Sequence, residues 1–172
     1  MTLAARVIAH LERHGVPAAV IGGVALGAHG IARATLDTDV LVTDTAVLSS
    51  VFWRGMRGAA RAEIRRGDAD DPLGGVVRFR SRRNSVDVLV GRGRWMQRML
   101  DHRTWLRVGR GRLPIVDRAD LVLLKLYAAG PQDLLDVRLL IEMDAVTLRQ
   151  TVEERVAEAP RSVSLRWRRM MS

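Results

Sequence analysis

Two aspartates, Asp37 and Asp39, are the residues whose types and spacing most directly suggest chemistry. They introduce the apolar run 40–42, which predicts a β-strand. Residues two apart on a strand point to the same face, so the two carboxylates should lie side by side. Neighbouring anions repel each other unless a cation lies between them. Mg²⁺ prefers carboxylate oxygens and keeps positions free for substrate phosphates, so the pair predicts a magnesium site, with Mn²⁺ as a second option.

A glycine turn, Gly22-Gly23, precedes these aspartates, with thirteen residues between Gly23 and Asp37. The turn follows the apolar run 18–21 and comes before a stretch of helical character. Glycines in such a position let backbone N–H groups approach a phosphate at a helix N-terminus. Taken alone, a Gly-Gly pair fits an ordinary turn, and an Asp-x-Asp pair fits a solvated strand edge. Together, the two motifs indicate nucleotide chemistry.

Two further charged residues lie within apolar segments. Asp87 interrupts the strand-like run SVDVLV at 85–90, where an unpaired buried carboxylate would be costly. It therefore belongs either to the same site or to the solvated face of an edge strand. Lys125 is the only lysine among 28 basic residues and lies in an apolar helix predicted over 117–129. A single lysine in a chain so rich in arginine suggests that this position needs a compact ammonium group. The alternative is chance, or a lysine whose charged end merely reaches solvent from a packed helix.

The stretch GGVALGAHGIARATLDTD at 22–39 resembles the signature of the DNA polymerase β-like nucleotidyltransferases. In that superfamily a Gly-Gly or Gly-Ser turn precedes Asp-x-Asp by about a dozen residues. The stretch looks most like the AbiEii/MenT-type toxin nucleotidyltransferases and is longer than the compact antitoxin-type motif. The run DLVLLKLYAAGPQDLLDVRLL at 120–140 resembles the helical half of the AbiEii-type proteins. The resemblance covers residues 16–142.

This resemblance implies a mixed α/β (α+β) fold, in which helices flank a mixed β-sheet and a helical C-terminal portion follows. It implies Mg²⁺-dependent transfer of a nucleoside monophosphate from an NTP to an acceptor hydroxyl. Two Mg²⁺ ions would be held by Asp37, Asp39 and Asp87. The implied catalytic residues are Asp37, Asp39, Asp87, Lys125 and Asp133. The implied nucleotide-binding residues are Gly22, Gly23, Arg33, Thr35 and Lys125.

The net charge of +9 favours a polyanionic acceptor, for which RNA, such as a tRNA 3′ end in a toxin role, is the leading interpretation. The basic turns 91–94 and 109–112 are either RNA-backbone contacts or plain surface turns. A cognate antitoxin protein is a second expected partner. The alternatives are a small-molecule adenylyltransferase of the aminoglycoside or lincosamide type, a protein-modifying antitoxin, and a non-catalytic nucleotide- or RNA-binding module. A +9 charge fits poorly with a cationic drug as acceptor.

Length and composition predict a single domain over 1–172. Its expected parts are a core at about 16–116, a helical portion at about 117–158 and a basic tail at 159–172, with 161–172 as a flexible arm. A helix is predicted over 44–57 and an acidic solvated loop over 68–75. Glycines and Pro17 in the uncharged segment 15–32 argue against a membrane span, so the expected location is cytoplasmic.

Overall fold

The centre of the protein is a mixed β-sheet, seen in a computed structural model that describes residues 2–56, 62–69, 71, 73–82 and 84–172. Its strands are β1 (Ala19–Ile21), β2 (Asp37–Val42), β3 (Glu63–Arg66), β4 (Leu73–Arg80), β5 (Ser85–Gly91), β6 (Thr104–Val108) and β7 (Gly111–Ile115). These seven strands of the described chain lie in the order β3-β4-β5-β2-β1-β7-β6. β2 is parallel to β5 and β1 to β7, and the other neighbours are antiparallel.

Helices flank this sheet and follow it. They are α1 (Leu3–Arg13), α2 (Gly22–Ala28), the 3₁₀-helix η1 (Thr45–Leu48), α3 (Arg94–Asp101), α4 (Arg118–Ala128), α5 (Pro131–Met143), α6 (Thr147–Val156) and α7 (Arg161–Met171). The predicted fold class, a mixed sheet flanked by helices with a helical C-terminal portion, is confirmed. Within the described residues, no helix is both long and apolar enough to cross a membrane.

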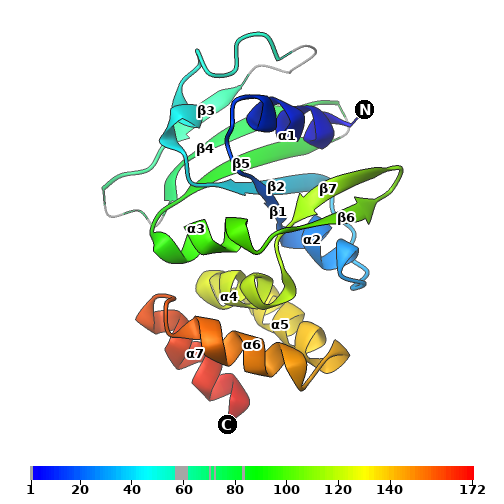
Figure 1. Cartoon of the computed structure of the whole chain (residues 1–172), viewed down its shortest axis with the longest axis vertical. Coiled ribbons are helices and arrows are strands. Elements are labelled where there is room, and N and C mark those ends of the chain that lie inside the picture. The colour runs from blue at the N-terminus through cyan, green and yellow to red at the C-terminus, as the bar shows by residue number, and fades with distance from the viewer. Residues whose placement is uncertain (1, 57–61, 70, 72, 83) are drawn as a thin grey trace.

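The molecule is elongated, with the sheet at one end and α4–α7 at the other (Figure 1). α3 lies between them, and α4 packs against α5, α6 and α7. Asp117 begins α4 by accepting a hydrogen bond from the Asp120 backbone N–H at 3.0 Å. Pro131 then begins α5 directly after the α4 end, where its missing N–H costs nothing. Short, well-capped connections thus set the position of the two helices that carry the Lys125 motif.

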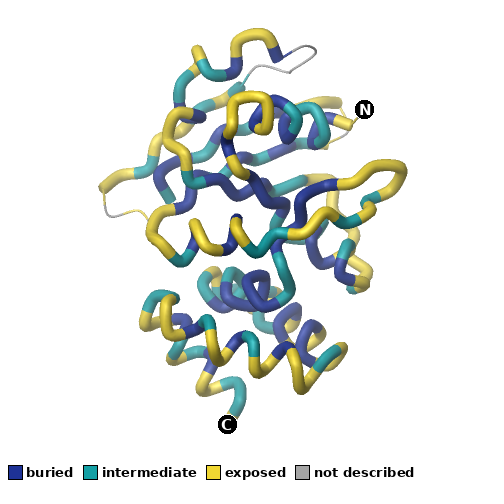
Figure 2. The backbone as a smooth tube through the Cα atoms, viewed as in Figure 1, coloured by how far each residue is buried: buried dark blue, intermediate teal, exposed yellow. Residues whose placement is uncertain are grey.

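Strand alternation divides the sheet into an apolar face and a charged face. Val40 and Val42 on β2 are completely buried, together with their β5 partners Val88 and Val90. The buried core continues through the sheet end and the helical end of the molecule (Figure 2). Because side chains alternate along a strand, the aspartates that flank these valines are directed to the opposite face.

The segment after β2 differs from the helix predicted over 44–57. Only Thr45–Leu48 forms a 3₁₀-helix, and turns follow it through Gly55. The indole N–H of Trp53 donates to the Val47 carbonyl at 2.7 Å, which folds the segment back on itself. Buried Trp53 therefore supplies tertiary contacts that override the local helical periodicity. Arg57 lies outside the described residues.

Two other predicted irregular segments are regular. Residues 73–75 belong to β4 and not to the acidic loop. The expected flexible arm over 161–172 is wrong, because α7 runs through Arg161–Met171 with Val163 and Trp167 fully buried. Arg166 also donates hydrogen bonds to the carbonyls of Leu126 and Tyr127 at the end of α4, at 2.9 and 3.2 Å. The basic composition of this segment hid an apolar stripe that packs on the helices.

Candidate active site

Three aspartates lie on the charged face of the sheet in adjacent strands. Asp37 and Asp39 belong to β2, and Asp87 belongs to the parallel neighbour β5. The register pairs Asp39 with Asp87, and Asp37 with Ser85. The Ser85 hydroxyl donates to Asp37 Oδ1 at 2.6 Å. Parallel pairing in register therefore brings together the carboxylates that the sequence separated by about fifty positions.

The Gly22-Gly23 turn lies directly against Asp39. Gly22 has φ +67°, and a Cβ there would stand 2.3 Å from Asp39 Oδ2. A side chain at this position would be strained and would clash with the carboxylate, so only glycine fits. A Cβ at Gly23 would meet the Thr35 side chain at 3.1 Å. The sequence prediction that this turn and the aspartates share one site is matched by their proximity.

The electrostatics of Asp39 reflect crowding by negative charge. Burial raises the pKa of its carboxyl, and the charges of Asp87 and Asp37 raise it further. The charges of Lys125 and Arg78 oppose this shift only in part. Asp39 thus stands between two other carboxylates, with one cation on the helical side and one on the sheet side.

On the helical side lies a cluster that we call the helix network, formed by Arg33, Lys125, Asp133 and Asp136. Lys125 Nζ lies 2.8 Å from Asp133 Oδ1 and 2.8 Å from Asp136 Oδ2. Burial alone would lower the pKa of Lys125, but its contacts with the two carboxylates outweigh burial and raise it. The lysine is therefore held charged with a side chain only 12% exposed.

Asp136 is the centre of the helix network. Its side chain is 1% exposed, and its second oxygen, Oδ1, pairs with Arg33 at 3.1 Å. Asp133 has a double role, because its Oδ2 also accepts the Gly130 N–H at 3.2 Å at the start of α5. The sequence identified Lys125 and Asp133, and Asp136 was missed. Its signal was present: an aspartate three residues after Asp133 lies on the same helical face.

Thr35 shapes the entry to β2. Its hydroxyl donates to the Asp37 carbonyl at 2.9 Å and accepts from the Asp37 N–H at 3.2 Å. This side chain is committed to the backbone of the first aspartate, while its methyl group lies against Gly23. Thr35 therefore positions the strand relative to the glycine turn.

On the sheet side, Arg78 and Asp87 form what we call the sheet pair. They are direct cross-strand partners on β4 and β5. Arg78 Nε donates to Asp87 Oδ1 at 2.8 Å, and Nη2 donates to Oδ2 at 2.5 Å. This two-point contact occupies both carboxylate oxygens. This pair was not expected from the sequence, because cross-strand partners nine residues apart become neighbours only once the hairpin register is known.

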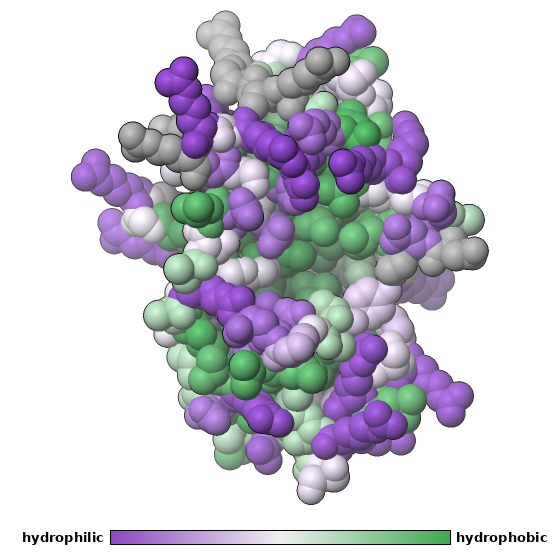
Figure 3. All heavy atoms as spheres, turned by 180° about the vertical axis from the view of Figure 1, so that it is seen from behind, coloured by the Kyte–Doolittle hydropathy of each residue, from purple (hydrophilic) through white to green (hydrophobic). Residues whose placement is uncertain are grey.

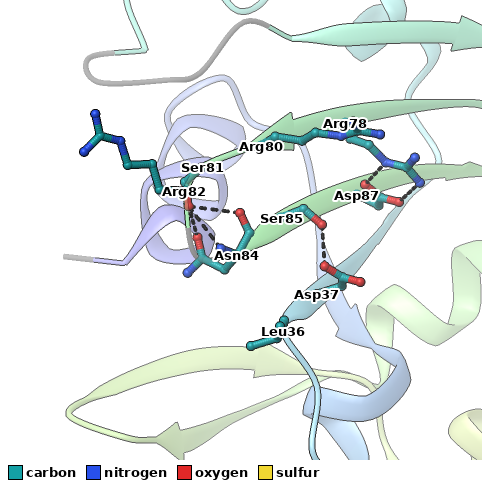
Figure 4. A pocket seen from close by; sticks show the side chains of 9 residues that line it. All are labelled: Leu36, Asp37, Arg78, Arg80, Ser81, Arg82, Asn84, Ser85 and Asp87. Carbon is teal, nitrogen blue, oxygen red and sulfur yellow. Dashed lines mark hydrogen bonds and ion pairs between the residues drawn. The ribbon is translucent and has the colours of Figure 1, made fainter.

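An open pocket of about 460 Å³ adjoins the aspartates, lined in part by Arg78, Arg80 and Arg82. Figure 4 shows Arg78 turned toward Asp87, Ser85 turned toward Asp37, and Arg82 extending outward. Arg80 is exposed, with its nearest carboxylate partner, Glu63, 4.0 Å away. From behind the molecule, hydrophilic side chains project around the rim of the sheet end (Figure 3). The pocket beside the carboxylates thus has cationic walls.

The donor set for a divalent cation is only partly in place. Among the described residues, no group of three or more His, Cys, Asp or Glu side chains is arranged to hold a metal ion. Asp37 and Asp39 fit one, because their adjacent carboxylates have no lysine or arginine within ion-pair distance in the described chain. Asp87 does not fit in this arrangement, because Arg78 takes both of its oxygens.

The two basic turns have separate positions. Arg92 donates to the carbonyls of Asp68, Ala69 and Asp71 at 2.7 to 2.9 Å, so it fixes the loop before β4. Arg110 lies exposed in the turn between β6 and β7. Arg92 is thus committed to the protein itself, whereas Arg94 of the same turn is exposed, as is Arg110 of the second turn.

Comparison with known proteins supports the same architecture. No protein-family model matches the chain, and neither does any curated protein sequence. Among solved structures, the antibiotic-resistance factor ANT(2″)-Ia in complex with adenylyl-2″-tobramycin matches with a TM-score of 0.58. The match has 11% identity and covers 90% of this chain and 95% of that one. The chain has the nucleotidyltransferase fold.

Two further structures show the same likeness. An antigenic nucleotidyltransferase-like protein from Paracoccidioides brasiliensis has a TM-score of 0.54 and 14% identity, covering 96% of this chain and 90% of that one. A candidate nucleotidyltransferase from Thermotoga maritima has a TM-score of 0.51 and 13% identity, covering 87% and 90%. At these identities the nucleotidyltransferase fold is what is shared. The closer resemblance to AbiEii/MenT-type toxins stays a prediction.

Proposed function

We propose that the protein is a nucleotidyltransferase that moves a nucleoside monophosphate from an NTP to a hydroxyl of an RNA acceptor. The observation that supports this most is the position of Asp39, which lies against the Gly22-Gly23 turn and is close enough to Asp37 and Lys125 to feel their charges. A glycine turn that contacts a carboxylate pair leaves room for a phosphate chain on one side of the pair. The cationic pocket lies on its other side.

The helical side suits the triphosphate. Backbone N–H groups at Gly22 and Gly23 would bind phosphate oxygens, and Lys125 would neutralise charge on the departing pyrophosphate. Asp133 and Asp136 hold that ammonium in position. Arg33 is 33% exposed beyond Asp136 and would contact the outer phosphate. Fixed cations of this kind stabilise the transition state because they need no rearrangement during the reaction.

Mg²⁺, or Mn²⁺ in its place, would be held by Asp37 and Asp39 and would polarise the α-phosphate and the attacking oxygen. The acceptor hydroxyl oxygen forms a bond to the α-phosphorus, and the bond from that phosphorus to the bridging oxygen breaks. Pyrophosphate leaves, and the hydroxyl proton passes to a site carboxylate. Asp37 receives the Ser85 hydrogen bond, which keeps its carboxylate turned toward the pocket.

The pocket walls favour a phosphate-bearing acceptor. Arg78, Arg80 and Arg82 line it, and arginine pairs well with phosphate oxygens. The likeness to ANT(2″)-Ia makes an antibiotic adenylyltransferase the second candidate function. Arg78 is paired with Asp87, but Arg80 and Arg82 add positive charge that would repel a polycationic aminoglycoside, so RNA, such as a tRNA 3′ end, is the better match.

The test is incubation with each labelled NTP and Mg²⁺, offering total RNA, total protein or an aminoglycoside panel in parallel. We expect label in RNA, from one preferred NTP, and no label with Asp39→Asn or with EDTA. Label confined to an aminoglycoside or to protein would replace the RNA proposal. Transfer undiminished by Asp39→Asn would end the metal-dependent mechanism.

The toxin–antitoxin context is tested in cells. Expression of the chain alone should slow growth, and the Asp39→Asn variant should not. A cognate antitoxin would then be the protein whose co-expression restores growth and which co-purifies with the chain. Normal growth with active soluble enzyme would remove the toxin role and leave the transfer activity in place.

A further inference from the structure

In the sheet pair, Arg78 binds the Asp87 carboxylate, which lies on the same face of the sheet as Asp37 and Asp39. Asp87 is the in-register partner of Asp39, and Arg78 takes both of its oxygens. Arg78 also lines the 460 Å³ pocket and borders a second hollow beside β3. Its guanidinium therefore contacts Asp87 and at the same time borders the place proposed for the acceptor.

The position of the sheet pair would allow Arg78 to exchange Asp87 for another anion. The Arg78 side chain is 39% exposed, whereas the Asp87 side chain is 15% exposed. Because the arginine side of the pair faces solvent, water and other anions can reach the guanidinium. A phosphate in the pocket presents the same flat two-point acceptor as a carboxylate. Exchange of Asp87 for a phosphate would cost the arginine little.

The Asp87 carboxylate, unlike the Arg78 guanidinium, lies in a crowded negative environment. Asp87 is less exposed and is close enough to Asp39 for its charge to raise the Asp39 pKa. Without Arg78, three negative charges would face one another, which favours binding of a divalent cation. Arg78 and a divalent cation therefore compete for the same carboxylate.

We propose that Arg78 couples acceptor binding to completion of the divalent-cation site. With no acceptor bound, Arg78 neutralises Asp87. A phosphate group of the acceptor draws the guanidinium into the pocket, and Asp87 becomes free to join Asp37 and Asp39 as a cation ligand. The proposal rests on the proposed RNA acceptor, and it names how that acceptor acts on the site.

This coupling discriminates between acceptors. A cationic acceptor has no anionic group to replace the Asp87 carboxylate at the guanidinium, so it would leave Asp87 paired. A phosphate-bearing acceptor would both bind and tighten the cation site. By linkage, the cation must then tighten acceptor binding by the same factor.

The test measures Mn²⁺ binding by electron paramagnetic resonance, with and without a short single-stranded RNA, against an RNA-only blank. We expect the RNA to tighten Mn²⁺ binding to wild type by at least about fivefold, a typical coupling factor. Arg78→Gln should bind Mn²⁺ tightly without RNA and show no further effect of RNA. Asp87→Asn should bind Mn²⁺ weakly in both conditions.

Arg80→Gln is the matched control, because Arg80 is two residues along the same strand face and has no contact with Asp87. It should weaken RNA binding yet keep the Arg78-dependent coupling. Arg78→Lys, which retains charge but cannot make the two-point contact, should show Mn²⁺ affinity between wild type and Arg78→Gln. Melting curves for each variant confirm folding.

Two outcomes would overturn the coupling: Mn²⁺ affinity of Arg78→Gln equal to that of wild type without RNA, or an undiminished RNA effect in Arg78→Gln. Failure of the proposed function looks different. In that case the transfer assay is negative for every NTP and acceptor, whereas the Mn²⁺ measurements keep the pattern above. The two claims therefore fail separately.

Discussion

The helix network and the sheet pair lie on opposite sides of Asp37 and Asp39, and they differ in burial. In the helix network, Asp136 is 1% exposed and joins two cations from different elements. In the sheet pair, one carboxylate meets one arginine at a surface that opens to a pocket. Both neutralise charge near Asp39, but only the second is free to change partners.

The difference in burial separates ion pairs that keep their partners from an ion pair that can exchange one. A buried carboxylate cannot lose its cations cheaply, because an unpaired charge in the interior is costly. An exposed pair loses only a weak contact when water or another anion replaces one partner. Substitutions in the helix network, in the sheet pair and at Asp39 between them test this difference.

The largest effect should come from Asp136→Asn. It removes the buried carboxylate that serves Lys125 and Arg33 together, and we expect the free energy of unfolding to fall by about 3 kcal/mol. Urea unfolding followed by circular dichroism measures it. Asp133→Asn is the control, since Asp133 is more exposed, and it should cost about 1 kcal/mol. Equal losses for the two variants would contradict the central position of Asp136.

Lys125→Arg tests whether the helix network needs a compact ammonium. The longer guanidinium should misplace the triphosphate and lower the transfer rate by about tenfold to a thousandfold, while folding is retained. Initial rates against NTP concentration measure the change, with Lys125→Ala as a variant expected to be at least as damaging. A near-wild-type rate and NTP affinity for Lys125→Arg would remove Lys125 from the site.

Asp39→Asn tests the crowding between the two regions. The folded protein raises the pKa of Asp39, so its ionised form costs stability at pH 7. That cost is relieved as pH falls through the raised pKa toward the ordinary value of 3.8. At pH 7, Asp39→Asn should therefore be more stable than wild type by about 1 kcal/mol, which corresponds to a melting temperature a few degrees higher. This difference in stability should vanish below pH 3.8. A constant difference across pH would contradict it.

Asp87→Asn should have the smallest effect on stability. The sheet pair is partly exposed, and its loss also relieves repulsion with Asp39. We expect a change within about 0.5 kcal/mol in the same urea experiment. A loss as large as that of Asp136→Asn would show that the sheet pair is as fixed as the helix network.

The sequence predicted the parts of the site that short-range spacing determines. Asp37 and Asp39 share a face because strand periodicity is two. Lys125 and Asp133 were implied by the family resemblance, and they meet because capped helices follow each other through Gly130 and Pro131. Arg78 could not be predicted as the partner of Asp87. That contact depends on the register of β4 against β5, which is set by the turn between the two strands and was not assigned from the sequence.

The predicted helix over 44–57 and the predicted arm over 161–172 failed for a related reason. In both segments a tryptophan decides the structure through tertiary contacts: Trp53 packs against His10 and Phe79, and Trp167 anchors α7. Burial of a large side chain outweighs local periodicity or basic composition.

These two tryptophans also give each end of the molecule its own optical reporter. Trp53 is buried at the sheet end with its indole N–H bonded to a carbonyl. Trp167 is buried at the helical end, where its Nε1 has no hydrogen-bond partner in the described chain. Variants that retain only Trp53, or only Trp167, of the four tryptophans in the chain would fluoresce from one end alone. Loosening of the sheet end and of the helical end could then be followed separately in solution, by emission wavelength and by quenching.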